Sequence, residues 1–293
     1  MRINVPLFAA SILFCLQRVT MRFFIRLSAV LTLLASGSSA LAQQAIVPAA
    51  RDPLAINLLV QSLTAAGGPA VSAIQDFTGT GNITYNWAGV AVSGSVKVYG
   101  KGLEEFRMES SMPAGNQILV VNGNEAILTP VYDTHAVSPM HATMTAGSPT
   151  FPAIRIAQVL SDSSISASYM GSVTWNGVQA YQVHIVLLMD PRLRLGSHFS
   201  GLGECDLYFD PNSYQLLGLA ERVWWDNDPR QSYLHELFFS EYRPANGTLA
   251  PFTITEKMGG QQTWSMTLSS LTFNSGLSDT LFDVLASENP PEG

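Results

Sequence analysis

Charged residues and cysteines are scarce in this chain, and each shortage excludes a class of protein. Only 13% of the 293 residues are charged, and they give a net charge of −7 at pH 7. Nucleic-acid binding rewards clustered Lys and Arg, so this acidic chain is not expected to bind nucleic acid. The same shortage of basic residues argues against a basic patch for membrane surfaces.

Residues 1–42 have the pattern of a targeting segment. A short basic stretch, Met21–Arg26, precedes the apolar run Leu27–Ala35 and the small residues Ala40-Leu41-Ala42, which is the order found in a secretory signal. The apolar run is shorter than the roughly 20 residues that cross a bilayer. We expect the protein to be periplasmic or secreted, with no transmembrane segment in the mature chain.

Two starts of the chain stay open at this point. The signal peptide is either residues 21–42, preceded by an upstream extension, or it begins at Met1 with a long N-terminal region. In both cases we expect a flexible leader at 43–50 and a single domain at 51–293. Cys205 is then the one cysteine of the mature chain, so no internal disulfide can form. The mature charge would be −11, from 11 basic and 22 acidic residues.

Alternating apolar and polar residues predict a mainly β (α+β) domain. Val96–Leu128 reads as three strands in a row, with a hairpin turn at Asn122-Gly123. Further strands follow as far as Leu268, among them Ile165–Trp175 as one alternating strand. Roughly eleven strands at this spacing favour one strongly curved antiparallel sheet, a half-barrel.

Two helices and a long loop interrupt the strands. Asp52 and Pro53 are suited to begin a helix, which the pattern places at Arg51–Ala66. A short mid-chain helix is predicted at Phe151–Leu160, and the segment before it, Thr129–Thr150, is predicted to be a surface loop.

The residue pattern gives little support for catalysis. The sequence lacks the H-E-x-x-H and G-x-S-x-G motifs. His135 and His141 are the best metal candidates, although two histidines in a Met-rich loop are more often surface residues. His235 and Glu236 are neighbours on a predicted strand and should point to opposite faces. Cys205 begins a strand and is expected to be a small buried hydrophobe. We expect no cofactor and no metal.

The stretch from Lys101 to Gly123 resembles the start of the LolA-type periplasmic lipoprotein carriers and of their LolB and outer-membrane lipoprotein-sorting-like relatives. The matching features are a basic turn residue, an inner aromatic, a Pro and a strand end: Lys101, Phe106, Pro113 and Val121-Asn122-Gly123. Two later pieces fit the same order, the mid-chain helix and the chain end: Thr150–Ile154, and Phe282 with Pro290–Gly293. In one departure, Gly102 follows the basic residue where the family has Pro.

The resemblance implies a half-barrel with an N-terminal helix and a short lid helix. Its concave apolar face would hold lipid or lipoprotein acyl chains without catalysis, and an envelope protein would be a further candidate partner. Lys101 is the expected lid contact. The expected ligand-binding residues are apolar or aromatic side chains on inner positions: Phe106, Met108, Phe151, Ile154, Leu160, Trp175, Tyr181, Trp264 and Met266.

Two other functions stay open beside lipid binding. The same apolar residues could form an ordinary core, since 47% of the chain is hydrophobic, and the protein would then be an envelope interaction or sensor module. A metal-dependent hydrolase that uses the loop at 129–150 is the second alternative.

Overall fold

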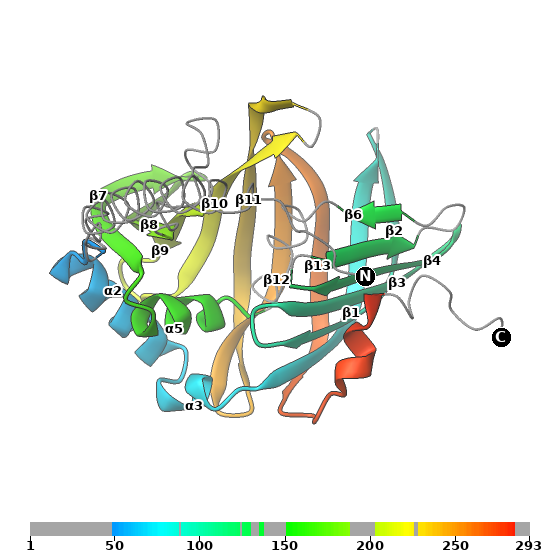
Figure 1. Cartoon of the computed structure of the whole chain (residues 1–293), viewed down its shortest axis with the longest axis horizontal. Coiled ribbons are helices and arrows are strands. Elements are labelled where there is room, and N and C mark those ends of the chain that lie inside the picture. Colours follow the sequence, from blue (N-terminus) through cyan, green and yellow to red (C-terminus); the bar gives the residue numbers. More distant parts are fainter. Residues whose placement is uncertain are drawn as a thin grey trace, which may run out of the picture. The chain divides into compact units, whose positions relative to one another are not determined.

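Thirteen strands form one antiparallel sheet (Figure 1). The computed structural model describes residues 49–87, 89–123, 125–129, 135–137, 151–187, 203–225 and 228–284, which all belong to one compact unit, residues 48–293. The strands are β1 Asp76–Trp87, β2 Val90–Lys101, β3 Glu105–Met112, β4 Gly115–Asn122, β5 Glu125–Thr129, β6 His135–Val137, β7 Ile165–Trp175, β8 Val178–Leu187, β9 Glu204–Phe209, β10 Leu216–Trp225, β11 Asp228–Ala245, β12 Thr248–Met258 and β13 Gln261–Phe273.

The chain builds this sheet outward from β1 in both directions. The strand order is β6-β5-β4-β3-β2-β1-β13-β12-β11-β10-β9-β8-β7. From β1 the chain adds strands one by one to β6, crosses to the far edge at β7, and returns strand by strand to β13. Among the described strands, β6 and β7 have one neighbour each, so the sheet stays open. The predicted curved antiparallel sheet is confirmed.

Both predicted helices form, and each begins two residues later than the pattern places it. The helices are α2 Pro53–Ala65, α3 Pro69–Ser72 and α5 Ala153–Ser161, with a 3-10 helix, η3, at Asp279–Phe282. The Asp52 side chain accepts the backbone N–H of Leu54 at 2.9 Å, and Pro53 occupies the first turn of α2. Helices α2 and α5 lie side by side (Figure 1). Both predicted helices are therefore present.

The strand face toward α2 and α5, called the inner face below, forms the main hydrophobic core. On β1–β4 it presents Phe77, Val98, Phe106 and Val121, which the antiparallel register brings to one side. Leu59 of α2 and Ile156 of α5 are buried in the same core. Successive side chains of a strand point to opposite sides, so the residues between these apolar ones point away from this core. That side of the sheet is called the outer face below.

A one-residue bulge in β7 changes which face its end presents. Tyr169 pairs with Val183 on the inner face, but Gly171 already pairs with Gln182. Met170 is the extra residue, and a slip of one residue moves every later side chain to the opposite face. The prediction of one uninterrupted alternation from Ile165 to Trp175 is therefore wrong after Tyr169.

The predicted loop at 129–150 contains a short strand. His135–Val137 forms β6, which pairs with β5. The other residues from 130 to 150, including His141, lie outside the described residues. Strand β6 has only three residues and no alternation long enough to reveal it in the sequence.

Arg51 joins α5 to the edge strand β7. Its Nη1 donates to the carbonyls of Asp162 and Ile165 at 2.8 and 3.2 Å, and its Nη2 to those of Val159 and Leu160 at 2.9 and 3.3 Å. The last carbonyls of a helix have no partner inside the helix, so this guanidinium supplies the missing donors at the C-terminal end of α5.

We predict that Arg51→Met lowers the free energy of unfolding by roughly 1–3 kcal/mol, because several carbonyls lose a charged donor. Urea unfolding followed by circular dichroism measures the change. Arg222→Met is the matched control, since Arg222 is exposed and bonds to Ser232 Oγ at 3.2 Å. Equal effects of the two substitutions would contradict this role of Arg51.

Candidate functional site

A groove of ≈ 790 Å³ lies where α3, α5 and the β2–β3 turn meet. Its apolar lining consists of Val71, Ile74, Leu103, Ile154 and Ala157, and its polar lining consists of Ser72, Lys101, Glu104, Glu105, Asn122, Gln158 and Ser161. The volume falls in the range of about 300–1,000 Å³ that is typical of small-molecule sites. An apolar wall beside a polar rim suits a ligand that has one apolar and one polar part.

Beneath α5 the described interior is packed. Phe151 is fully buried, and its ring centroid lies 4.7 Å from that of Phe273. A cavity of ≈ 20 Å³ lies beside Phe151, Ile156 and Leu216, which is room for about one water molecule. The space beside Phe151 is therefore too small for a long apolar ligand while α5 keeps this position.

The structure distributes the predicted ligand-binding residues over three places. Most belong to the main core, either buried in it or packed against it: Phe106, Met108, Phe151, Leu160, Tyr181, Trp264 and Met266. Ile154 packs against this core and also lines the groove. Trp175 lies elsewhere. Of the ten predicted site residues, Ile154 and Lys101 are the two that the groove brings together.

Trp175 lies on the outer face, because the β7 bulge precedes it. Its ring stacks on Tyr208 and on Phe238, with centroids 4.4 and 4.5 Å apart. Gly218 makes room for this ring, since a Cβ at that position would come within 2.2 Å of the indole. The structure thus separates Trp175 from the other predicted site residues.

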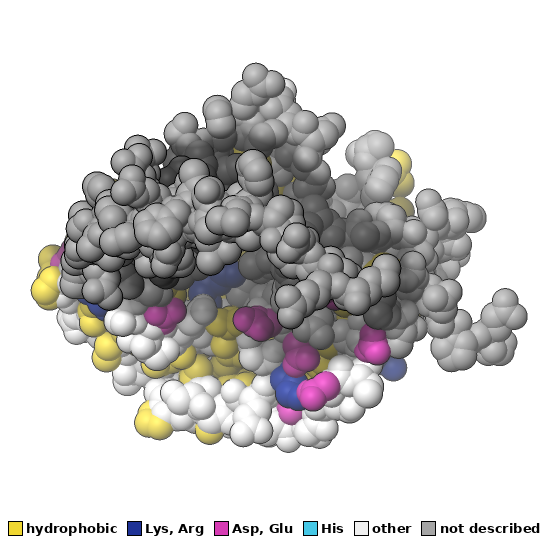
Figure 2. Space-filling view, viewed as in Figure 1, with side chains coloured by type: hydrophobic (Ala, Val, Ile, Leu, Met, Phe, Trp, Pro, Cys, Tyr) yellow, Lys and Arg dark blue, Asp and Glu magenta, His cyan; other side chains and the backbone are white. Residues whose placement is uncertain are grey.

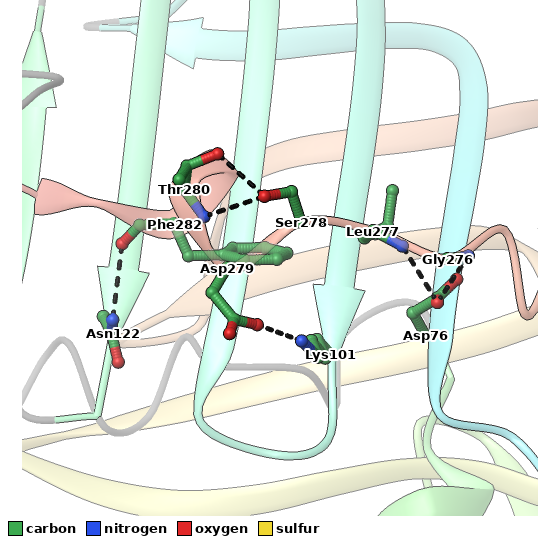
Figure 3. A network of polar contacts seen from close by, with 9 residues as sticks. All are labelled: Asp76, Lys101, Asn122, Gly276, Leu277, Ser278, Asp279, Thr280 and Phe282. Atoms are coloured by element: carbon green, nitrogen blue, oxygen red, sulfur yellow. Dashed lines mark hydrogen bonds and ion pairs between the residues drawn. The ribbon is translucent and has the colours of Figure 1, made fainter.

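Lys101 lies at the groove and contacts the C-terminal segment (Figure 3). Its ammonium forms an ion pair with Asp279 of η3. The same segment receives Arg107 Nη1 at the carbonyl of Leu281, 3.2 Å away, and buries Phe282 completely. The predicted lid contact of Lys101 stays a prediction. The chain end at 290–293 lies outside the described residues.

Asp76 anchors the start of this C-terminal segment. Its buried carboxylate accepts the backbone N–H of Ser275 at 2.6 Å. It also accepts those of Gly276 and Leu277 at 2.9 and 3.2 Å (Figure 3). Three donors satisfy a carboxylate that burial would otherwise penalise. The segment that carries Asp279 to the groove is therefore fixed at its root.

A second group of polar side chains lies on the inner face under α5. His235 Nδ1 is 3.2 Å from Glu221 Oε1, and its Nε2 is 3.1 Å from Glu256 Oε1. Arg155 of α5 lies 3.6 Å from Glu221 Oε2. These side chains come from β10, β11, β12 and α5, and at most 19% of each is exposed.

The two carboxylates hold His235 in its charged form. Burial alone would lower its pKa, but the hydrogen bonds and charges of Glu221 and Glu256 outweigh burial and raise the pKa to about 9. For Glu221, burial is likewise outweighed by His235 and Arg155, and its pKa lies below the usual range. Two carboxylates and two cations thus compensate each other inside an apolar face.

Sequence reasoning missed this network. His235 was considered with Glu236, which points to the opposite face, whereas its partners come from neighbouring strands. The sequence does contain one indication of this network. His235 lies two residues before Leu237 and therefore on the same buried face of the strand, and a buried ionisable residue needs a partner. Within the described chain, no group of three or more His, Cys, Asp or Glu side chains is arranged to hold a metal ion.

We predict that, because of this network, the free energy of unfolding decreases as the pH rises into the alkaline range. The pKa of His235 rises from 6.5 to about 9 on folding, so its contribution is fully present below pH 6.5 and is lost as pH rises through 9. The loss should be on the order of 3 kcal/mol, at 1.36 kcal/mol for each pKa unit. Urea unfolding between pH 6 and pH 10 measures it, and an NMR titration of the imidazole gives the midpoint.

His235→Gln should remove this slope. His184→Gln is the matched control, because His184 pairs with Asp206 on the outer face at 3.0 Å with 31% of its side chain exposed. An imidazole midpoint near 6.5 in the folded protein would contradict the charged form of His235.

No protein-family model matches the sequence, and no curated protein matches it. Solved structures do resemble it, among them these three. A DUF1329 family protein from Desulfovibrio piger is 14% identical over 80% of this chain and 97% of its own, with a TM-score of 0.47. A LolA superfamily protein from Nitrosomonas europaea is 9% identical over 78% and 96%, with a TM-score of 0.47. A domain described as outer membrane lipoprotein-sorting, from Vibrio parahaemolyticus, is 11% identical over 79% and 100%, with a TM-score of 0.45.

The resemblance to LolA-type proteins that the sequence indicates is therefore also found among solved structures. Because all three TM-scores lie below 0.5, function has to be inferred from the residues of this chain. No helix in the described ranges is long and apolar enough to cross a membrane.

Proposed function

We propose that this protein is a non-catalytic binding protein that holds the acyl chain of a lipid or lipoprotein between α5 and the sheet. The observation that carries this proposal is the ≈ 790 Å³ groove along α5, with Ile154 and Ala157 on the helix side and Val71 and Ile74 opposite. The targeting pattern of residues 1–42 supports a location in the periplasm or outside the cell.

The energetics favour a long apolar chain as the ligand. Each methylene that leaves water contributes about 0.8 kcal/mol, so a chain lying along the apolar lining is held without a specific polar contact. The packed core beneath α5 would admit more of the chain if the helix moved outward. Outward movement would have to break the polar contacts of Arg51 and Arg155 and expose Ile156 and Val159.

The described nucleophile and base candidates support a non-catalytic role. Burial raises the pKa of the Cys205 thiol well above its usual range, so this group stays protonated. Both ring nitrogens of His235 are engaged by carboxylates. Neither group lines the groove.

We predict that native mass spectrometry of the protein, purified from an envelope fraction, detects a bound acyl-chain species that organic solvent extracts. Ile154→Asp places a charge on the apolar wall and should weaken uptake of a fluorescent fatty acid at least tenfold, since desolvating a charge costs far more than a methylene contributes. Ile154→Trp should also weaken uptake, because the larger ring fills the groove.

Val178→Asp is the matched control, because Val178 is 50% exposed and pairs with Trp175 on the outer face. It should leave uptake unchanged. Melting temperatures of all variants separate lost binding from lost folding. A mass without ligand, together with no uptake of an added fatty acid or long-chain amine by the folded wild-type protein, would refute the proposal.

A second candidate is a protein-interaction or sensor module. The packed interior favours it, because the described inner face already buries its aromatic residues completely at Phe77, Phe106 and Phe151. In that case the sheet would act as a binding surface for an envelope protein. A ligand-free mass and no lipid uptake are the results expected of this alternative.

A further inference from the structure

The groove has an acidic mouth, and its charges bear on the kind of ligand that it takes. Of the described residues that line it, Lys101 alone is basic, while Glu104 and Glu105 are acidic. Lys101 is already paired with Asp279. On the face drawn in Figure 2, magenta acidic side chains gather near yellow apolar ones, with few dark blue basic ones between them.

Three carboxylates act on the Lys101 ammonium. Asp279 bonds to it directly, and the charges of Glu105 and Asp76 act on it as well, so the pKa of Lys101 is raised, first by its bond to Asp279. Glu104 adjoins Glu105. Because Asp279 is paired with Lys101, Glu104 and Glu105 leave an excess of two negative charges among the described residues that line the groove.

Arg107 does not cancel this excess. Arg107, on the neighbouring strand, is ion-paired with Glu109 at 2.7 Å, and its Nη1 bonds to the carbonyl of Leu281. Burial raises the pKa of Glu105, and Asp279 and Glu104 act in the same direction against Lys101. The carboxylates at the mouth therefore repel one another, and an added positive charge would relieve this repulsion.

We propose that the groove selects a lipid whose exposed head carries a positive charge, with its acyl chain along Ile154 and Ala157 and its head beside Glu104 and Glu105. This inference rests on the proposed lipid-binding function and narrows it. A phosphate or carboxylate head would meet the same carboxylates and would be repelled. The apolar wall recognises the chain, and the charges at the mouth recognise the head.

Two probes with the same chain and opposite heads test this selection. Dodecylamine and dodecanoate, each below its micelle concentration, are titrated into the full-length protein by displacement of a fluorescent fatty-acid analogue at pH 7. Exposed charge pairs contribute about 0.2–1 kcal/mol each, so two carboxylates should favour the amine over the carboxylate on the order of tenfold. The preference should shrink in high salt, which screens exposed charges.

The double variant Glu104→Gln/Glu105→Gln should lose this preference. Glu236→Gln/Glu241→Gln is the matched control, because it removes the same net charge from residues that do not line the groove. Equal or tighter binding of dodecanoate overturns the inference about the head while lipid binding stands. A preference for dodecylamine that persists in Glu104→Gln/Glu105→Gln also overturns the inference about the head. If neither probe binds the folded protein, both the proposed function and this inference fail.

Discussion

The attachment of α5 to the sheet is the interaction on which the interior and the groove both depend. One side of this helix buries Ile156 and Val159 in the main core, and another side forms the wall of the groove. Arg51 bonds to the end of the helix, and Arg155 bonds from the helix to Glu221 below it. Apolar packing stabilises α5 against the sheet, and the polar contacts of the two arginines fix where the helix lies.

How far the charges in this protein balance each other depends on how much water surrounds them. Under α5, opposite charges are nearly equal in number, because uncompensated charge in an apolar interior costs several kcal/mol. At the mouth of the groove water is near, so an excess of carboxylates around Lys101 is tolerated. Because water screens these carboxylates, their mutual repulsion costs the folded state little. The carboxylates then stay available to contact a ligand.

Much of the fold could be predicted from the sequence, because alternation and turn residues act over short distances. Gly123 adopts a positive φ in the hairpin turn predicted at Asn122-Gly123, and Asp52 caps its helix. The functional site was harder to predict. Ile154 and Lys101 were identified, but the other residues at the groove come from turns and strand ends, where no periodicity indicates what will meet in space.

Two failures have specific physical causes. Trp175 was assigned to the inner face because a bulge leaves no reliable mark on alternation, and one extra residue at Met170 reverses every later side chain. The network around His235 joins residues 14 and 21 positions apart on three strands. Only the register of those strands brings them together, and register depends on the whole sheet.

The pairing of β1 with β13 affects how the chain can fold. Phe77 pairs with Phe273, so the centre of the sheet joins its first strand to its last. Contacts between segments so distant in the chain give a high contact order, and such topologies fold slowly because a long loop must close first. The sheet cannot be completed until nearly the whole chain has been synthesised. Until β13 is present, the half of the sheet formed by β1–β6 has no strand that joins it to the half formed by β7–β12.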